Sequence, residues 1–129
     1  YTHHHFSLLP MNDWGEKKHM IEIKSNSVTF DSLCQKYNIK DIDYLQIDTE
    51  GFDSEIIKSI DFNKFNIKTL RYEKWDFDTE CFSKYHNENK EKYGINGMRK
   101  IKEKLTNYNL SDIKDKDGRD ILAVKKNLF

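Results

Sequence analysis

One stretch of the chain constrains the fold more than any other: a short apolar run that ends in acidic residues and one glycine, just before a helical pattern begins. Its apolar side chains, Tyr44, Leu45 and Ile47, are typical of a strand largely buried on both faces, as in a parallel sheet flanked by helices. Gly51 allows the sharp turn from strand to helix. Asp53 would cap that helix, because its side chain can accept hydrogen bonds from free N–H groups of the first turn.

A second strand follows that helix, and it also ends in an acidic residue. Residues 67–73 are predicted to form this strand, with Ile67, Leu70 and Tyr72 as core contacts. The strand finishes at Glu73, whereas the first strand is followed by Asp48 and Glu50. Strand, helix, strand is a βαβ unit, in which the two strands are parallel. We therefore expect Asp48, Glu50 and Glu73 to meet at the edge where open α/β sheets bind their ligands.

The remaining segments supply supporting elements. Residues 30–37 form a predicted helix capped by Thr29, with one buried stripe of Phe30, Leu33, Cys34 and Tyr37. On that stripe Cys34 is interpreted as a small buried hydrophobe and not as a nucleophile. A second helix is predicted from about Asn96, with apolar residues Met98, Ile101 and Leu105, and a β-hairpin is predicted over 108–125 with its turn at 117–118.

Two histidine-containing segments carry weaker signals. His3, His4 and His5 are adjacent in sequence, so their side chains point in different directions, and a surface tract explains them better than a metal site. Residues 78–93 are polar and lack a sustained period, which favours an insertion or lid over the sheet end. His86 lies in that insertion and is interpreted as an exposed loop histidine, with a role as a catalytic base the weaker alternative.

Length and charge narrow the function classes. The chain has 129 residues and is predicted to form one domain over 1–129. Its 22 basic and 22 acidic residues balance, so we expect neither a nucleic acid nor a membrane surface as partner. No apolar run approaches the roughly 20 residues that span a bilayer. Cys34 and Cys81 form no C-x-x-C pair, which favours free thiols in a reducing, cytoplasmic setting.

Four segments together resemble the FkbM family of S-adenosylmethionine-dependent methyltransferases. They are VTFDSL at 28–33, IDYLQIDTEGFD at 42–53, LRYE at 70–73 and DILAV at 120–124. The resemblance implies the second half of a class I methyltransferase sheet. The expected fold is therefore α/β and partly Rossmann-like, with parallel central strands, flanking helices and a C-terminal antiparallel β-hairpin.

The chain departs from the family pattern at three places. Gln46 stands where the family commonly has lysine, and Asp53 where it commonly has glutamate. The family also holds its cofactor with a glycine-containing turn after the first strand and an acid after the second, and neither is found here. The chain is therefore predicted to be the C-terminal portion of an FkbM-like domain, without its N-terminal cofactor-binding strands.

The candidate site residues follow from the strand ends and from the resemblance. Asp48, Glu50 and Glu73 are catalytic candidates, because a carboxylate near an acceptor hydroxyl can act as general base, and crowding of carboxylates can raise one pKa or create a cation site. Asp48 and Gly51 are cofactor-binding candidates, although bonding to turn amides is the structural alternative for Asp48. Tyr72 and Trp75 are candidates for the walls of an acceptor pocket, with aromatic core packing as the alternative.

The predicted function is S-adenosylmethionine-dependent O-methylation of a hydroxyl on a small molecule or glycan, as part of a longer enzyme. The alternative is a non-catalytic α/β interaction module derived from a methyltransferase. A metal-dependent hydrolase ranks last, because the sequence lacks a suitable spacing of His and Asp ligands. We also expect one edge of the strand at 44–48 to be uncovered, which would favour association with another chain.

Overall fold

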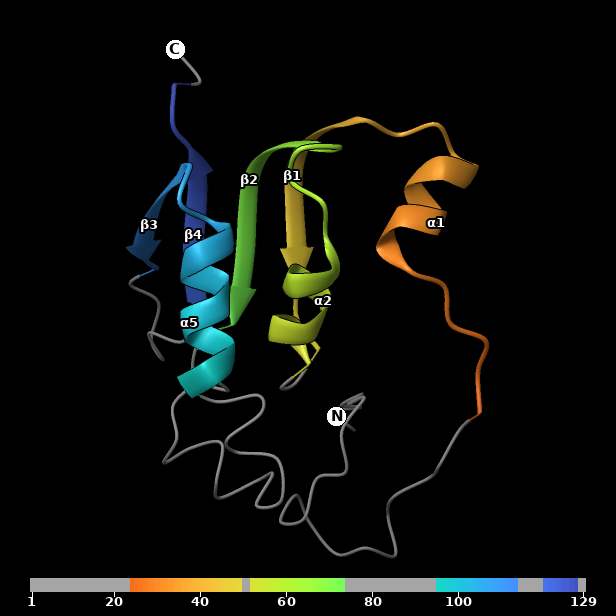
Figure 1. The fold of residues 1–129 in the computed structure, drawn as a ribbon, viewed down its shortest axis with the longest axis horizontal. Coiled ribbons are helices and arrows are strands. Elements are labelled where there is room, and N and C mark those ends of the chain that lie inside the picture. Colours follow the sequence, from red (N-terminus) through yellow and green to blue (C-terminus); the bar gives the residue numbers. More distant parts are fainter. Residues whose placement is uncertain (1–23, 50–51, 74–94, 114–119, 128–129) are drawn as a thin grey trace, which may run out of the picture.

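The computed structural model describes residues 24–49, 52–73, 95–113 and 120–127, with 95–98 described by their backbone alone. A four-stranded sheet in the order β1-β2-β4-β3 forms its centre (Figure 1). The elements along the chain are α1 (Phe30–Lys36), β1 (Asp41–Ile47), α2 (Asp53–Ser59), β2 (Asn66–Glu73), α5 (Ile95–Lys104), β3 (Tyr108–Asp112) and β4 (Asp120–Lys125).

The strand pairing confirms the predicted parallel unit. β1 and β2 are parallel, with Ile42 beside Ile67 and Ile47 beside Tyr72. β4 is antiparallel to both β2 and β3, as expected for a C-terminal hairpin placed against a parallel pair. The chain is therefore a mixed α/β protein, and its sheet is consistent with part of a methyltransferase fold.

Several predictions concern residues outside the described part of the chain. They are those for His3, His4, His5, Glu50, Gly51, Trp75, Cys81, His86, the insertion at 78–93 and the turn at 117–118.

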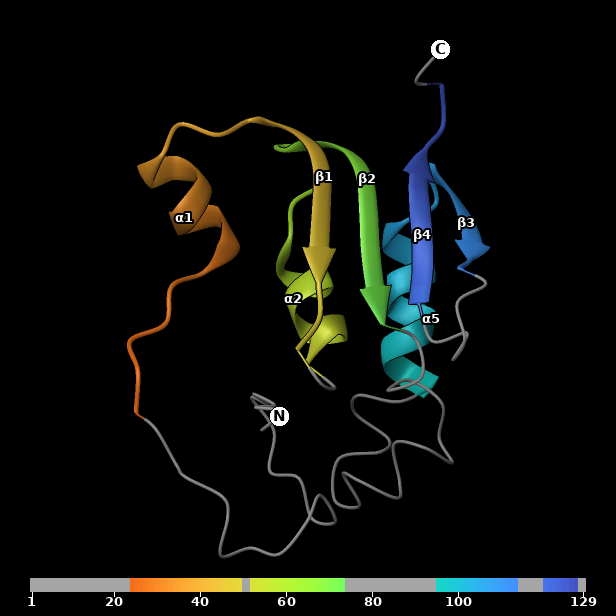
Figure 2. The same cartoon turned by 180° about the vertical axis from the view of Figure 1, so that it is seen from behind.

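The described helices α2 and α5 cover one face of the sheet and pack against each other (Figure 1). Seen from behind, the strands lie in front of these two helices, and no described helix covers the opposite face (Figure 2). The core lies between the sheet and the helices. Its most deeply buried side chains include Ile57 and Ile60 after the first strand, Leu70 and Ala123 on the sheet, and Ile101 and Leu105 near the end of α5.

This one-sided cover corrects the prediction for β1, which was expected to be buried on both faces. Successive side chains of a strand point to opposite faces. Ile47 faces the helices and is 6% exposed, and Leu45, two residues earlier, packs against the same core. Tyr44 has the opposite parity and is 51% exposed. The apolar run is therefore buried on one face in the described part of the chain.

The prediction for α1 is confirmed in its boundaries and wrong in its burial. The Thr29 side chain caps the helix by accepting a hydrogen bond from the Ser32 N–H at 3.1 Å, and Cys34 is buried. Leu33 and Tyr37, however, are exposed. Of the predicted stripe, Phe30 and Cys34 are the residues that pack against the core. The Phe30 and Phe65 rings meet edge to face, with their centroids 5.3 Å apart.

A membrane-spanning segment is not among the described elements. Within the ranges given above, every helix is too short and too polar to cross a bilayer.

Candidate active site

The carboxyl ends of β1 and β2 lie side by side at the same end of the sheet, because the two strands are parallel and neighbours (Figure 1). Ile47 and Tyr72 are the last register pair, so Asp48 and Glu73 follow next to each other. Asp48 is exposed at this edge, and Glu73 is half-buried. The structure thus brings together two of the three carboxylates that the sequence nominated.

A third carboxylate, Asp53, links these two strand ends from below the surface. Asp53 is fully buried. Its Oδ1 atom accepts a hydrogen bond from the Thr49 N–H at 2.8 Å and a second one from the Thr49 hydroxyl. Its Oδ2 atom accepts a hydrogen bond from the Glu73 N–H at 3.0 Å. One side chain therefore fixes the residue after Asp48 and the last residue of β2.

This arrangement corrects the prediction that Asp53 caps α2. The N-cap residue is Phe52, whose side chain makes no capping bond, and Asp53 is the first residue of the helix. The N–H groups of Glu55 and Ile56 instead bond to the carbonyl oxygen of Phe52. The carboxylate is directed to the strand ends because the N–H of Glu73 and that of Thr49 offer it donors there.

The pKa of Asp53 is raised, and burial is the main cause. Loss of solvation disfavours the charged form, and the nearby charge of Asp48 adds to this effect. The hydrogen bonds from Thr49 and from the Glu73 N–H act in the opposite direction, without reversing the shift. Because Asp53 is buried and already accepts three hydrogen bonds, it is suited to hold the site in place and not to exchange protons with a substrate.

Sequence reasoning missed this role. The only signal was an acidic residue at the start of a helix, directly after a strand and turn, and capping explains such a residue equally well. The raised pKa lies on Asp53, which the sequence did not nominate as catalytic, and its main cause is burial and not crowding of carboxylates.

Tyr72 lies in the core, on the face of β2 that the helices cover. It is 5% exposed and has Ile47 beside it in the sheet. Burial raises the pKa of its hydroxyl, and the charge of Asp112 raises it further. Tyr72 therefore packs in the hydrophobic core, which is the alternative that the sequence left open for it.

Ser54, beside Asp53, is also buried, and its hydroxyl has no hydrogen-bond partner among the residues that the structure describes. Two polar side chains thus lie under the strand ends at the start of α2. An unsatisfied buried hydroxyl costs stability, which makes Ser54 a useful probe of this region.

A parallel β-α-β unit with carboxylates at the carboxyl ends of its strands defines the chain as an α/β protein. A sequence model of the methyltransferase FkbM domain matches residues 2–113. The chain therefore belongs to the FkbM methyltransferase family. Neither the comparison with curated proteins nor the comparison with solved structures gives a match.

Proposed function

We propose that this chain is part of an S-adenosylmethionine-dependent O-methyltransferase that acts on a hydroxyl of a small molecule or glycan. One observation carries the proposal: Asp48 and Glu73 of an FkbM-family chain lie side by side at the carboxyl ends of neighbouring parallel strands. On this proposal the chain represents the C-terminal portion of the catalytic domain, and a longer polypeptide supplies the remaining strands.

The carboxylates at the ends of β1 and β2 fit the proposed cofactor. S-adenosylmethionine carries a cationic sulfonium, an ammonium group and ribose hydroxyls, all of which interact favourably with carboxylates. Asp48 is the described residue best placed to hold it, because its side chain is exposed at the strand end. When bound, the cofactor supplies an activated methyl group.

The chain's own carboxylates then perform two tasks. The carboxylate of Asp48 or Glu73 accepts the proton of the attacking hydroxyl. Such general-base catalysis raises the rate by roughly a hundred- to ten-thousand-fold. Asp53 keeps both strand ends at a fixed separation through its hydrogen bonds to Thr49 and Glu73. Fixed geometry matters because alignment of the reactants contributes on the order of 7–11 kcal/mol to such displacements at best.

A cytoplasmic location is part of this proposal. Cys34 is a free, buried thiol in the structure, which is compatible with a reducing compartment.

Calorimetric titration of the longer polypeptide that contains this chain, with S-adenosylmethionine and S-adenosylhomocysteine as ligands, tests the proposal. We expect measurable binding that Asp48→Asn weakens by roughly tenfold, the loss of one charge-assisted contact. Asp43→Asn is the matched control, because Asp43 lies on the same strand, exposed and away from the carboxyl end. If the longer wild-type polypeptide binds neither compound, the proposal fails.

A non-catalytic interaction module is the second candidate, and one observation favours it. Five of the large apolar side chains that are exposed lie between residues 28 and 44, on α1, on β1 and in the segments that flank α1: Val28, Leu33, Tyr37, Ile39 and Tyr44. Exposed apolar side chains are typical of an interaction site where they form one patch, and this segment supplies five of them. Binding of a partner without binding of S-adenosylmethionine would favour this candidate over the first.

A further inference from the structure

An ion pair joins β2 to β4 close to the candidate active site. The Arg71 side chain on β2 donates a hydrogen bond from Nε to Asp120 Oδ2, and its Nη2 atom forms an ion pair with the same oxygen. Asp120 is the first residue of β4. Both residues belong to segments that resemble the FkbM family pattern, LRYE and DILAV, and sequence reasoning assigned neither of them a role.

The Arg71–Asp120 pair lies beside Glu73. β2 and β4 are antiparallel neighbours, as Figure 2 shows, and Asp120 is the register partner of Glu73. Arg71 is two residues before Glu73 on the same strand, so their side chains leave the sheet on the same face. That face is opposite to the one on which Tyr72 packs against the core. Glu73 therefore has a second carboxylate on the neighbouring strand, and the cation that holds this carboxylate is on its own strand.

Acidic groups surround Glu73 from the other elements as well. Asp48 follows the strand on its other side, and the buried carboxylate of Asp53, on α2, accepts a hydrogen bond from the Glu73 N–H. Asp112 ends β3, one strand beyond β4. α5 lies on the other face of the sheet, and its Arg99 is exposed. This end of the described strands is therefore predominantly acidic, which gives the charge of Arg71 particular weight.

Arg71 is well suited to compensate this negative charge. Its pKa is raised, chiefly by the hydrogen bond to Asp120, so the guanidinium stays charged. The Arg71 and Asp120 side chains are only 32% and 17% exposed, so solvent screens the pair in part. Without the guanidinium, Glu73 would lie next to an uncompensated like charge, which favours the protonated form of a carboxylate. A protonated carboxyl group cannot accept the proton of a hydroxyl.

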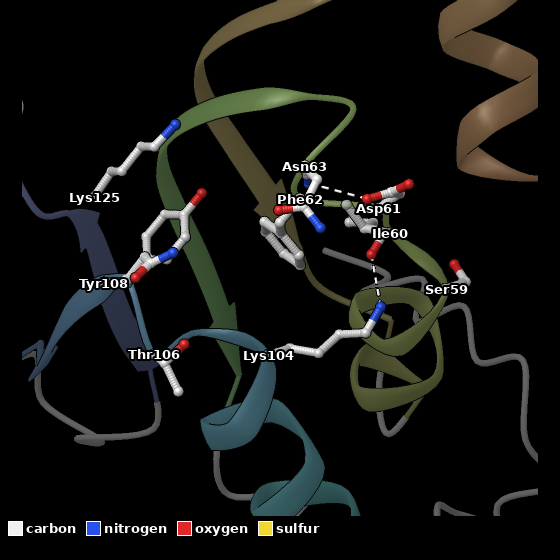
Figure 3. A pocket seen from close by; sticks show the side chains of 10 residues that line it. Ser59, Ile60, Asp61, Phe62, Asn63, Lys104, Thr106, Tyr108 and Lys125 are labelled. Carbon is white, nitrogen blue, oxygen red and sulfur yellow. Dashed lines mark hydrogen bonds between the residues drawn. The ribbon is translucent and has the colours of Figure 1, made fainter.

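The pocket of about 390 Å³ at the opposite end of the strands has no comparable arrangement (Figure 3). Lys104 and Lys125 lie on opposite sides of it, with the rings of Phe62 and Tyr108 between them. Each ammonium group bonds to a different segment of the chain. The charged groups of that pocket therefore do not converge, whereas those at the carboxyl end of β2 do.

We propose that Arg71 is a positioning residue for Glu73: it holds Asp120 beside Glu73, and its positive charge keeps Glu73 ionised as the base of the candidate site. The inference rests on the proposed function, because it takes Glu73 as the group that accepts the hydroxyl proton while Asp48 holds the cofactor. Asp53 fixes the end of β2 on the side of β1, and the Arg71–Asp120 pair fixes it on the side of β4.

The test is a carbon-13 NMR titration of the Glu73 carboxyl group in the longer polypeptide that contains this chain. Arg71→Gln removes a positive charge and should raise the pKa of Glu73. Asp120→Asn removes a negative charge and should lower it, each by roughly 0.5–1 pKa unit, as charges near a partly solvated surface do. Both variants break the same ion pair, so a purely structural effect would have the same sign in both. Arg71→Lys keeps the charge and should restore most of the wild-type value.

Lys68→Gln is the matched control. Lys68 lies on the same strand and forms an exposed ion pair with Asp43, away from Glu73, so its replacement should leave the pKa of Glu73 unchanged. Shifts of the same sign in Arg71→Gln and Asp120→Asn, or no shift in either, overturn the proposal. Should Asp120→Asn fail to fold, Arg71→Gln and Arg71→Lys decide, since equal shifts in these two would exclude a role of the charge.

This titration requires neither S-adenosylmethionine nor an acceptor. Its result is therefore independent of the calorimetric test of the proposed function, and either of the two can fail alone.

Discussion

The carboxylate of Asp53 accepts a hydrogen bond from the backbone N–H of Glu73, 3.0 Å away, and so joins the start of α2 to the end of β2. The other oxygen of the same carboxylate binds Thr49, directly after Asp48. The residues that carry the two carboxylates of the candidate site are therefore held in place by a third carboxylate, which is fully buried.

This relationship predicts a specific pH dependence for Asp53→Asn. An asparagine places an N–H₂ group where one carboxylate oxygen accepted a bond, so we expect a loss of roughly 1–3 kcal/mol in unfolding free energy. Because the folded-state pKa of Asp53 is raised, its contribution to stability is complete below the unfolded value, 3.8, and is lost as the pH rises through the folded value. The destabilisation should therefore be largest in acid and smaller at neutral pH.

Urea denaturation of wild type and variant between about pH 4 and 7 measures this difference. Asp43→Asn controls for the removal of one negative charge, because Asp43 is exposed on the neighbouring part of β1. A difference for Asp53→Asn that grows with pH would contradict the raised pKa.

Ser54 offers a second test of the same region. Its buried hydroxyl has no partner in the described part of the chain, so Ser54→Ala removes an unsatisfied group and should be neutral or stabilising by up to about 1 kcal/mol. Ser59→Ala on the same helix is the control, since the Ser59 hydroxyl donates to the Ile56 carbonyl at 2.7 Å. Thermal denaturation compares the two, and a clear loss of stability in Ser54→Ala would reveal a partner for this hydroxyl.

The difference in burial between two leucines predicts different losses of stability when each is replaced by alanine. Leu70 is fully buried on the central strand β2, so Leu70→Ala should cost roughly 2–5 kcal/mol in unfolding free energy. Leu33 on α1 is 43% exposed, and Leu33→Ala should cost no more than about 0.5 kcal/mol. Chemical denaturation of both variants gives these values, and similar losses would mean that α1 is buried as its sequence pattern indicated.

The contrast between these two leucines shows what the sequence could predict. Periodicity identifies which side chains share a face, and it correctly located β1, β2, α1, α2 and the C-terminal hairpin. Whether another element covers that face depends on residues distant in sequence. Leu33 and Tyr44 were therefore expected to be buried and are exposed.

At the candidate site, too, the sequence predicted some features and missed others. The parallel orientation of β1 and β2 followed from the β-α-β order, and with it the expectation that Asp48 and Glu73 lie at the same end of the sheet. The role of Asp53 did not follow, because its partner at Glu73 is 20 positions away and local rules assign an acid at a helix start to capping. A contact that depends on where two strands end is visible only once both strands are placed.

The last prediction concerns association of two or more copies of the chain through β1, an edge strand of the described sheet. β1 pairs with β2 alone among the described strands, and Tyr44 projects from it with half of its surface exposed. A strand edge with free N–H and C=O groups pairs readily with another chain, and a lysine there discourages such pairing. We expect the 129-residue chain to associate as its concentration rises, and Tyr44→Lys to reduce this. Leu110→Lys on β3, at the other end of the described sheet, is the matched control. Sedimentation velocity over a range of concentrations distinguishes the outcomes: a wild-type chain that stays monomeric throughout, or an equal response of both variants, would show that β1 does not mediate association.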